Sequence, residues 1–266
     1  MQSHSSLSDD ELRAYRRDGY LILRGRFSPG EIDALQNEAE RLYRSDLVDP
    51  DNLRTPMRPL PDGTRGVERV DPVIDVSDLF RRVLSDERVL EPVRRIFGEP
   101  AHLFKDKLIF KHPGMCGYSM HQDYAWWQPQ GNTSDLPEIA PEKILSVMIA
   151  IDPADALNGA IELFPGYHDR LLTPPGLLTN LREEELGQID LQTGVLGVTA
   201  PGDIVLFHSL TPHRSESNRS TGSRRQLYMT YNAASAGDIY ASQQAHYRAY
   251  MQAARKKNNQ PPGFLR

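Results

Sequence analysis

Residues 202–208 read Gly-Asp-Ile-Val-Leu-Phe-His, a short apolar run that leaves a turn and carries the chain toward His213. An apolar run of this length, bounded by glycine and rich in β-branched and aromatic residues, is typical of a buried strand. Similar short apolar runs occur at Leu108 to Phe110, Leu145 to Ile151, Ala160 to Phe164, Val195 to Val198 and Leu227 to Tyr231. Several short strands separated by glycine and proline predict a β sandwich or barrel rather than a parallel α/β sheet.

Helical patterns flank this strand-rich region on both sides. Ser8 and Ser28 are each followed three residues later by glutamate, which is the capping-box signature of a helix start. Asp75 to Phe97 returns to helical spacing, and residues 241–257 predict a C-terminal helix. We expect a single domain over residues 1–266, mainly β with flanking helices, with a helical part at about 8–98, a β core at about 102–235 and a helix at about 241–257.

Residues 46–72 are rich in proline, aspartate, glycine and arginine and show no periodicity. Long irregular segments in compact domains tend to be functional or mobile. An active-site lid and a plain surface excursion are therefore both compatible with this segment.

The composition of the chain excludes some classes of function. Its 266 residues are 39% hydrophobic and carry a net charge of -5, so there is no electrostatic case for a nucleic-acid partner. One cysteine, Cys116, cannot form an internal disulfide, and we expect it to be a small buried apolar residue. No run approaches the roughly 18 apolar residues of a membrane span, so we expect a cytoplasmic protein with no membrane partner.

His121, Asp123 and His213 form the pattern that points to chemistry. Residues two apart on a strand point the same way, so His121 and Asp123 can share a site that His213 completes. Two histidines and one carboxylate are the ligands of non-haem Fe(II) oxygenases, because they leave positions open for cosubstrate and oxygen. Taken alone, the pattern is also compatible with a core histidine and a turn carboxylate.

Arg224 adds a second feature to this pattern. It follows His213 after a polar segment, residues 217–222, that is suited to a hairpin and would bring the two side chains together. The planar fork of an arginine pairs with a carboxylate, such as that of a dicarboxylic cosubstrate. The alternative for Arg224 is a solvated surface arginine.

Together these motifs resemble the phytanoyl-CoA dioxygenase family of Fe(II)/2-oxoglutarate-dependent oxygenases. The specific parts of the resemblance are His121-Gln122-Asp123, Asn158-Gly159-Ala160, Phe164-Pro165-Gly166-Tyr167-His168, and Gly202-Asp203 leading to His213-Arg214-Ser215 and Arg224. The resemblance implies a double-stranded β-helix, a cupin-like jelly roll, in which His121, Asp123 and His213 bind Fe(II). It also implies that Arg224 and Ser215 bind 2-oxoglutarate.

The activity implied by the resemblance is hydroxylation of an unactivated C–H bond of a small molecule, using O2 and 2-oxoglutarate and releasing succinate and CO2. Asp123 favours hydroxylation, because related halogenases lack the carboxylate at this position. Two alternatives are a non-catalytic metal-binding jelly-roll protein, acting as a sensor or structural partner, and a zinc hydrolase with the same ligands. A hydrolase needs a general base beside the metal-bound water, and the sequence nominates none. The substrate and the oligomeric state are left open.

Some neighbouring residues have less defined roles. Lys107 lies on the strand before the metal motif, where family members place a cosubstrate-facing side chain, so it is a candidate for binding 2-oxoglutarate; the alternative is an exposed strand lysine. Tyr167 and Met148 depart from the family pattern, which commonly has serine at the first position and, in phytanoyl-CoA hydroxylase, a cosubstrate-holding tryptophan at the second. His208 competes for the role of third ligand, but the family spacing selects His213 and makes His208 a pocket or core histidine.

Aromatic residues crowd around the metal motif, namely Tyr118, Tyr124, Trp126 and Trp127. Aromatic faces attract cations, so one hypothesis is a small cationic or zwitterionic substrate held beside the iron by Tyr124, Trp126 and Trp127. The other interpretation is that the tryptophans belong to the apolar core.

Overall fold

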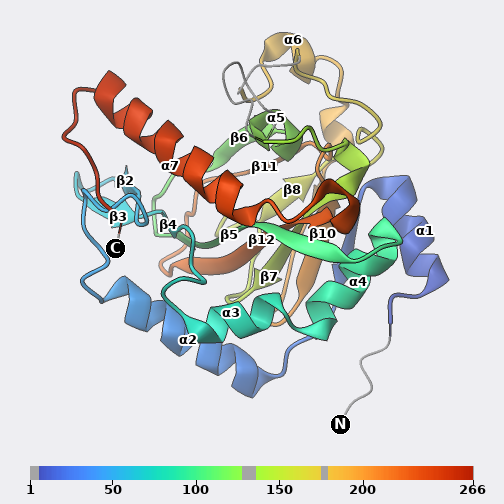
Figure 1. The fold of residues 1–266 in the computed structure, drawn as a ribbon, viewed down its shortest axis with the longest axis horizontal. Coiled ribbons are helices and arrows are strands. Elements are labelled where there is room, and N and C mark those ends of the chain that lie inside the picture. Colours follow the sequence, from blue (N-terminus) through green and yellow to red (C-terminus); the bar gives the residue numbers. More distant parts are fainter. Residues whose placement is uncertain (1–5, 128–135, 175–178, 266) are drawn as a thin grey trace.

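The computed structural model describes residues 6–127, 136–174 and 179–265, in which two antiparallel sheets pack together (Figure 1). The six-stranded sheet has the order β1-β10-β7-β12-β5-β4, the four-stranded sheet has the order β6-β11-β8-β9, and β2 pairs with β3 alone. The strands are β1 Tyr20–Leu23, β2 Met57–Pro59, β3 Arg65–Val67, β4 Arg69–Val70, β5 Ala101–Lys111, β6 Tyr118–His121, β7 Ile144–Ala150, β8 Ile161–Leu163, β9 Val195–Leu196, β10 Ile204–His208, β11 His213–Ser215 and β12 Arg224–Ala233. The predicted β sandwich or barrel is confirmed.

Seven α-helices lie within the described ranges, and most precede the β core in sequence (Figure 1). They are α1 Asp9–Asp18, α2 Pro29–Tyr43, α3 Asp78–Leu84, α4 Glu87–Phe97, α5 Asp123–Trp127, α6 Glu183–Leu186 and α7 Tyr240–Lys257. None of the helices in residues 6–127, 136–174 and 179–265 is long and apolar enough to cross a membrane.

The helix ends follow local sequence signals. Ser8 and Ser28 both form the predicted capping boxes, and Gly19 ends α1 in the left-handed conformation with φ of 80°. The predicted helical stretch Asp75 to Phe97 is two helices rather than one. The side chain of Asp86 accepts a hydrogen bond from the Arg88 backbone N–H and so starts α4 immediately after α3 has ended.

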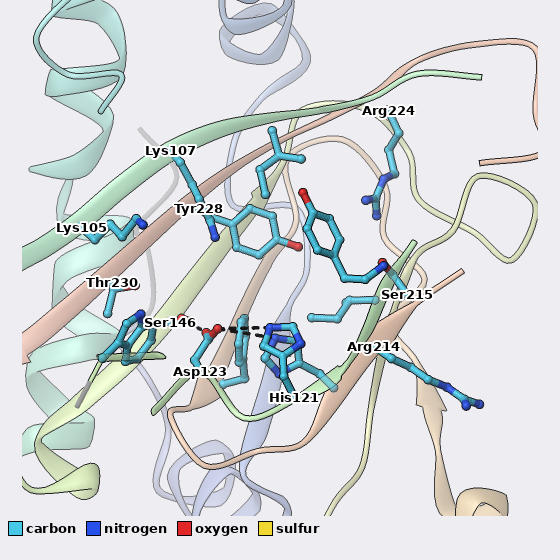
Figure 2. A pocket seen from close by; sticks show the side chains of 16 residues that line it. Lys105, Lys107, His121, Asp123, Ser146, Arg214, Ser215, Arg224, Tyr228 and Thr230 are labelled. Atoms are coloured by element: carbon cyan, nitrogen blue, oxygen red, sulfur yellow. Dashed lines mark hydrogen bonds and ion pairs between the residues drawn. The ribbon is translucent and has the colours of Figure 1, made fainter. Parts of the chain in front are cut away.

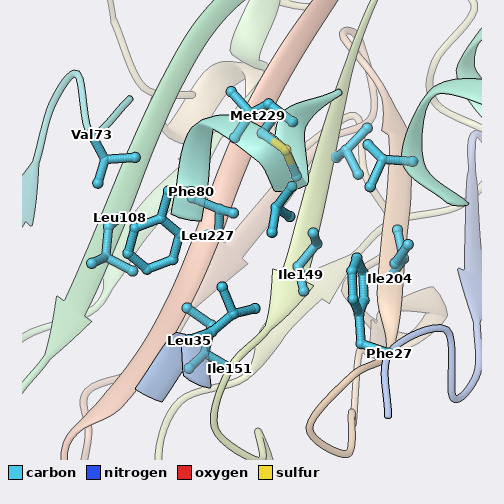
Figure 3. Packing of buried hydrophobic residues seen from close by; sticks show 14 of the residues in the cluster. Phe27, Leu35, Val73, Phe80, Leu108, Ile149, Ile151, Ile204, Leu227 and Met229 are labelled. Atoms are coloured by element: carbon cyan, nitrogen blue, oxygen red, sulfur yellow. The ribbon is translucent and has the colours of Figure 1, made fainter. Parts of the chain in front are cut away.

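The main apolar core lies between the helices and one face of the six-stranded sheet (Figure 3). Leu108, Ile149 and Leu227 point from β5, β7 and β12 toward Leu35 of α2 and Phe80 of α3. Because side chains alternate along a strand, the intervening residues of the same strands point the other way, into the space between the two sheets. That space holds the polar residues described below.

The segment 46–72 is not an irregular excursion throughout, since it contains β2, β3 and β4. Thr55 is fully buried, and β4 pairs with β5 at the edge of the six-stranded sheet. The helix α7 runs past the same edge, where Arg69 of β4 donates a hydrogen bond to the Tyr247 hydroxyl (Figure 1). The segment and α7 therefore build one side of the molecule together.

Candidate active site

Two histidines and an aspartate meet where β6, β11 and α5 come together. His121 ends β6 and His213 begins β11, and the two residues pair directly across these antiparallel strands. Asp123 lies at the start of α5, so its predicted place on a strand with His121 is wrong. A strand register and a strand-to-helix turn together bring the three side chains to one point.

The turn between His121 and Asp123 is held by Gln122. Its side chain is completely buried, donates hydrogen bonds to the carbonyls of Arg170 and Leu210, and accepts one from the Leu172 N–H. These bonds connect two loops, one containing Arg170 and Leu172 and the other Leu210, to the turn between His121 and Asp123. Gln122 is thus the residue that sets the direction of Asp123.

Both imidazoles are oriented by backbone carbonyls. Nδ1 of His121 lies 2.8 Å from the Ser119 oxygen, and Nδ1 of His213 lies 2.9 Å from the Thr211 oxygen. A carbonyl only accepts hydrogen bonds, so each Nδ1 carries the proton and each Nε2 keeps a lone pair. The two Nε2 atoms lie 3.6 and 3.8 Å from Oδ1 of Asp123, and ligand atoms of the three residues all lie within 4.8 Å of one another.

The protonation states of these groups suit metal binding. Burial acts to raise the pKa of Asp123, but the nearby His213, His121 and Lys107 outweigh it and hold that pKa below its ordinary value. Burial, together with the neighbouring His121, lowers the pKa of His213 to about 4. The Ser146 hydroxyl donates to Oδ2 of Asp123 at 2.7 Å, which leaves Oδ1 facing the histidines (Figure 2).

A narrow cavity of about 110 Å³ opens from the triad into the space between the sheets, and Arg224 reaches into it (Figure 2). The Arg224 side chain is 2% exposed, and its Nε and Nη1 are buried without a hydrogen-bond partner among the described residues. The next residue, Arg225, points the other way and forms paired hydrogen bonds of 2.7 and 2.8 Å with Asp152. A buried guanidinium with unused donors is costly unless a ligand completes it.

Ser215 and Lys111 lie at the same end of this cavity. The Lys111 ammonium donates to Ser215 Oγ at 2.9 Å and to the Gly159 and Glu216 carbonyls. Burial, followed by the nearby Arg224 cation, lowers the pKa of Lys111 to about 7. Gly159 has φ of 71°, and a Cβ there would lie 2.1 Å from the Glu216 oxygen, so only glycine allows this close approach.

A larger cavity of about 690 Å³ adjoins the triad on the side of α7. Its walls come from the 46–72 segment, β5, β6, α5 and α7, and they include His121 and Asp123. Trp126 and Trp127 of α5 line it, with Trp127 packed against Phe104 at 5.7 Å between ring centroids. The site therefore has two chambers, a narrow one toward Arg224 and a wide one beneath α7.

The structure places most of the predicted site residues in these chambers. Lys107 lines both, and burial, followed by the charge of Lys105, lowers its pKa to about 8. Tyr124 lies outside both linings, because its hydroxyl donates to the Ile139 carbonyl and its ring packs on the cluster around Phe104. Met148 is fully buried in the cluster between the sheets and does not line either chamber.

Two further expectations are corrected. Residues 216–223 do not close a hairpin, because β11 belongs to the four-stranded sheet and β12 to the six-stranded one, although His213 and Arg224 do line the same cavity. Cys116 is exposed and lines the larger cavity, so its predicted burial is wrong. His208 lines neither chamber, and its Nδ1 accepts the Leu210 N–H.

Sequence reasoning missed several residues that line the chambers, among them Lys105, Ser146, Tyr228 and Thr230. A usable signal exists on two strands, because residues at intervals of two share a face. Lys105 is two residues from Lys107 on β5, and Tyr228 shares the face of Arg224 on β12. The α7 residues of the larger cavity carry no such signal, because only tertiary packing brings that helix to the site.

Comparison with known proteins gives consistent matches over most of the chain. The sequence model of the family described as phytanoyl-CoA dioxygenase (PhyH) matches residues 15–226. A 2-aminoethylphosphonate dioxygenase from an uncultured bacterium is 27% identical over 237 residues, which are 88% of this chain and 85% of the relative. An ectoine dioxygenase from Bordetella bronchiseptica is 27% identical over 245 residues, covering 86% of this chain and 76% of the relative.

The fold also matches solved structures. A crystal structure of EctD from S. alaskensis with 2-oxoglutarate and 5-hydroxyectoine superposes with a TM-score of 0.75, at 22% identity, over 88% of this chain and 79% of that one. The match confirms the predicted double-stranded β-helix, or jelly roll.

Proposed function

The chain belongs to the phytanoyl-CoA dioxygenase family of Fe(II)- and 2-oxoglutarate-dependent oxygenases, and from this premise we propose that it hydroxylates an unactivated C–H bond of a small molecule. One observation carries the proposal: a two-histidine, one-carboxylate triad shares a cavity with a buried, unpaired arginine. The triad alone suits several metals. The arginine adds a requirement for an anionic ligand beside the metal.

The triad fits a ferrous ion in ligand type and protonation. His121 and His213 each offer an Nε2 lone pair, and Asp123 offers Oδ1 as a carboxylate. Three protein ligands on one face leave the other coordination positions to small molecules, as non-haem Fe(II) oxygenases require. We therefore assign His121, Asp123 and His213 as the residues that would hold the iron.

The narrow chamber fits 2-oxoglutarate. The free Nε and Nη1 donors of Arg224 would receive its distal carboxylate, since a guanidinium pairs with a carboxylate through two parallel hydrogen bonds. Ser215 lies in the same chamber, and its Oγ accepts hydrogen bonds from the Lys111 ammonium and the Tyr118 N–H. Because these bonds use the oxygen only as an acceptor, the hydroxyl proton of Ser215 is free to be donated to a ligand in the chamber. We assign Arg224 and Ser215 to cosubstrate binding, with Lys111 as the residue that positions Ser215.

Ferrous iron, when bound, would activate O2, the oxidant, and 2-oxoglutarate would supply two of the electrons as it is converted to succinate and CO2, with the second oxygen atom going to the substrate. The protein supports this chemistry by holding ligands still and excluding water. Backbone carbonyls keep both imidazoles in the Nε2-binding tautomer, and Ser146 fixes the rotation of the Asp123 carboxylate. Phe207 and Ile161 give the narrow chamber apolar walls, which strengthen every polar contact inside it.

The alternatives are less well supported by the same geometry. A zinc hydrolase needs a general base beside the metal, yet among the described residues that line the narrow chamber the only histidine or acidic groups are the triad itself. A metal-binding protein without turnover would have no use for a buried arginine whose donors await a ligand.

The proposal is tested by anaerobic addition of Fe(II) and 2-oxoglutarate to the purified protein. A keto acid chelated to ferrous iron gives a visible charge-transfer band, and admission of O2 should then release succinate. A protein that forms no band with Fe(II) and 2-oxoglutarate, and releases no succinate in air, would contradict the proposed function.

A further inference from the structure

The wall of the larger cavity that faces the triad carries an unusual number of cations. Lys105 and Lys107 of β5 line both this cavity and the narrow chamber that Figure 2 draws, and Arg58 and Arg69 line the larger cavity from the 46–72 segment. All four are at least partly buried. A cavity wall with this many positive charges needs counter-charges, whether from the protein or from a ligand.

The part of the chain that the structure describes supplies only some of the counter-charge. Glu68 pairs with Arg58 at 2.7 Å and with Arg69 at 2.8 Å, and Asp71 pairs with Arg69 at 3.2 Å. Asp71 also lies 3.4 Å from Lys105. Among the described residues these four cations thus share two carboxylates, which leaves an excess of two positive charges in that set once Asp123 is counted with the metal triad.

Lys107 shows the excess most clearly. Within the described ranges its ammonium has no hydrogen bond and no carboxylate within ion-pair distance, and it lies 5.4 Å from the centroid of the Tyr228 ring. Lys105, two residues away on the same face of β5, has a single long ion pair. Two neighbouring ammonium groups therefore face the cavity with most of their donors unused.

Two tyrosines of the larger cavity already hold cations of the protein. The Tyr118 ring holds the Arg58 guanidinium at 4.5 Å, and the Tyr247 ring holds the Lys105 ammonium at 4.2 Å. The cation-binding faces of these tyrosines are thus used by the protein itself. Trp126 and Trp127 lie on the α5 side and offer an apolar wall.

We propose that the larger cavity binds a substrate carrying a dianionic oxyacid group, a phosphonate or phosphate, which Lys105 and Lys107 receive while its carbon part lies against Trp126 and Trp127. The proposal rests on the proposed function and names the substrate class of that site. An excess of two positive charges favours a dianion over a single carboxylate. The cavity volume of about 690 Å³ suits a small molecule and places it beside His121 and Asp123.

The chain contains its own reporter for this test, because its two tryptophans both line the cavity. Propylphosphonate, butyrate and propyltrimethylammonium would be titrated against the anaerobic Fe(II) and 2-oxoglutarate complex at constant ionic strength, with tryptophan fluorescence as readout. We expect saturable binding of propylphosphonate that is about tenfold or more tighter than binding of butyrate, because the dianion accepts additional charge-assisted hydrogen bonds. Propyltrimethylammonium should bind most weakly.

Variants distinguish a specific role of Lys105 in binding from a general effect of net charge. Lys105→Gln should weaken propylphosphonate binding by about tenfold, through the loss of one charge-assisted contact, and Lys105→Arg should restore most of the loss. Lys257→Gln, at an exposed position of α7, is the matched control and should leave binding unchanged.

Three outcomes would overturn the proposal while leaving the oxygenase assignment in place. They are tighter binding of the ammonium probe, a Lys105→Gln variant that binds propylphosphonate as well as the unmodified protein does, and loss of the charge-transfer band as propylphosphonate displaces 2-oxoglutarate. Failure of the band to form before any probe is added would count instead against the proposed function.

Discussion

The two faces of β12 differ in how their charged groups are satisfied. Arg225, on the face toward the helices, is paired with Asp152 and also donates to the Gln36 carbonyl. Arg224, on the face between the sheets, is more deeply buried and has two donors without a partner. Of these two adjacent arginines, Arg225 thus stabilises the fold, whereas Arg224 has donors available for a ligand.

The neighbouring strand β5 repeats this difference. Asp106, on the helix-facing side, is fully buried and accepts hydrogen bonds from the Val73 and Ile74 N–H groups and from the Tyr240 hydroxyl. Lys107, on the other side, has no such partners among the described residues. The lesson is that, in this fold, unsatisfied buried charge marks the site better than charge alone does. Each prediction below tests one of the two faces.

The largest effect is expected on the site face from Asp123→Ala. Removing one of the three candidate ligands should lower Fe(II) affinity on the order of a thousandfold. The comparison is with structural zinc sites, in which four ligands together give a metal-binding free energy of roughly 10–16 kcal/mol. Succinate release should fall to background, while the variant should remain folded. Full turnover by this variant without added chloride would overturn the assignment of Asp123 as a ligand.

Truncating a side chain on the opposite, helix-facing side of β12 should lower stability rather than metal binding. Leu227 of β12 is fully buried in the core beneath the helices, so Leu227→Ala should lower the free energy of unfolding by about 3 kcal/mol. Urea denaturation measures this loss. At a temperature where the variant is folded, its charge-transfer band with Fe(II) and 2-oxoglutarate should match that of the unmodified protein.

The adjacent residues Arg224 and Arg225 provide the sharpest contrast between the two faces of β12. Arg224→Leu should weaken 2-oxoglutarate binding on the order of a hundredfold, as expected when one partner of a buried charge pair is lost. Because it removes unpaired donors, it should leave the ligand-free protein equally stable or more stable.

Arg225→Leu is the control and should do the reverse, lowering stability by leaving Asp152 buried and unpaired while 2-oxoglutarate binding is retained. Titration of the charge-transfer band and urea unfolding of both variants measure the two effects. Equal losses of 2-oxoglutarate affinity in the two variants would contradict the distinction between the faces.

The smallest predicted effect is a pH dependence from Asp106. Burial raises the pKa of Asp106 from 3.8 to about 6, so between these values the folded state holds a proton that the unfolded state has released. The resulting stability is fully present below about pH 4 and is lost as the pH rises through about 6.

The Asp106→Asn variant lacks this titration. The stability difference between the unmodified protein and the variant, followed by urea unfolding from pH 4 to pH 7, should therefore drift against the unmodified protein as the pH rises. A difference that stays constant across this range would show that Asp106 does not titrate in the folded state.

Much of this arrangement could be predicted from the order of residues along the chain. Short apolar runs predict the strands, serine and glutamate three residues apart predict the starts of α1 and α2, and the family motifs point to His121, Asp123, His213 and Arg224. These signals are local, because a capping box or an apolar run depends on neighbours within a few residues. The candidate metal ligands could likewise be nominated from the sequence, since imidazole and carboxylate chemistry is a property of the residue type.

Only the tertiary structure decided which groups have partners. Local patterns could not show that Gln122 turns the chain at the site, that residues 216–223 cross between sheets, or that α7 walls the larger cavity. They also could not show that Arg225 is paired while donors of Arg224 are not, because this depends on whether a carboxylate from elsewhere in the chain reaches each residue. Hydrogen-bond satisfaction depends on groups that are distant in sequence, and for that reason the ligand-binding face emerges only when the sheets are assembled.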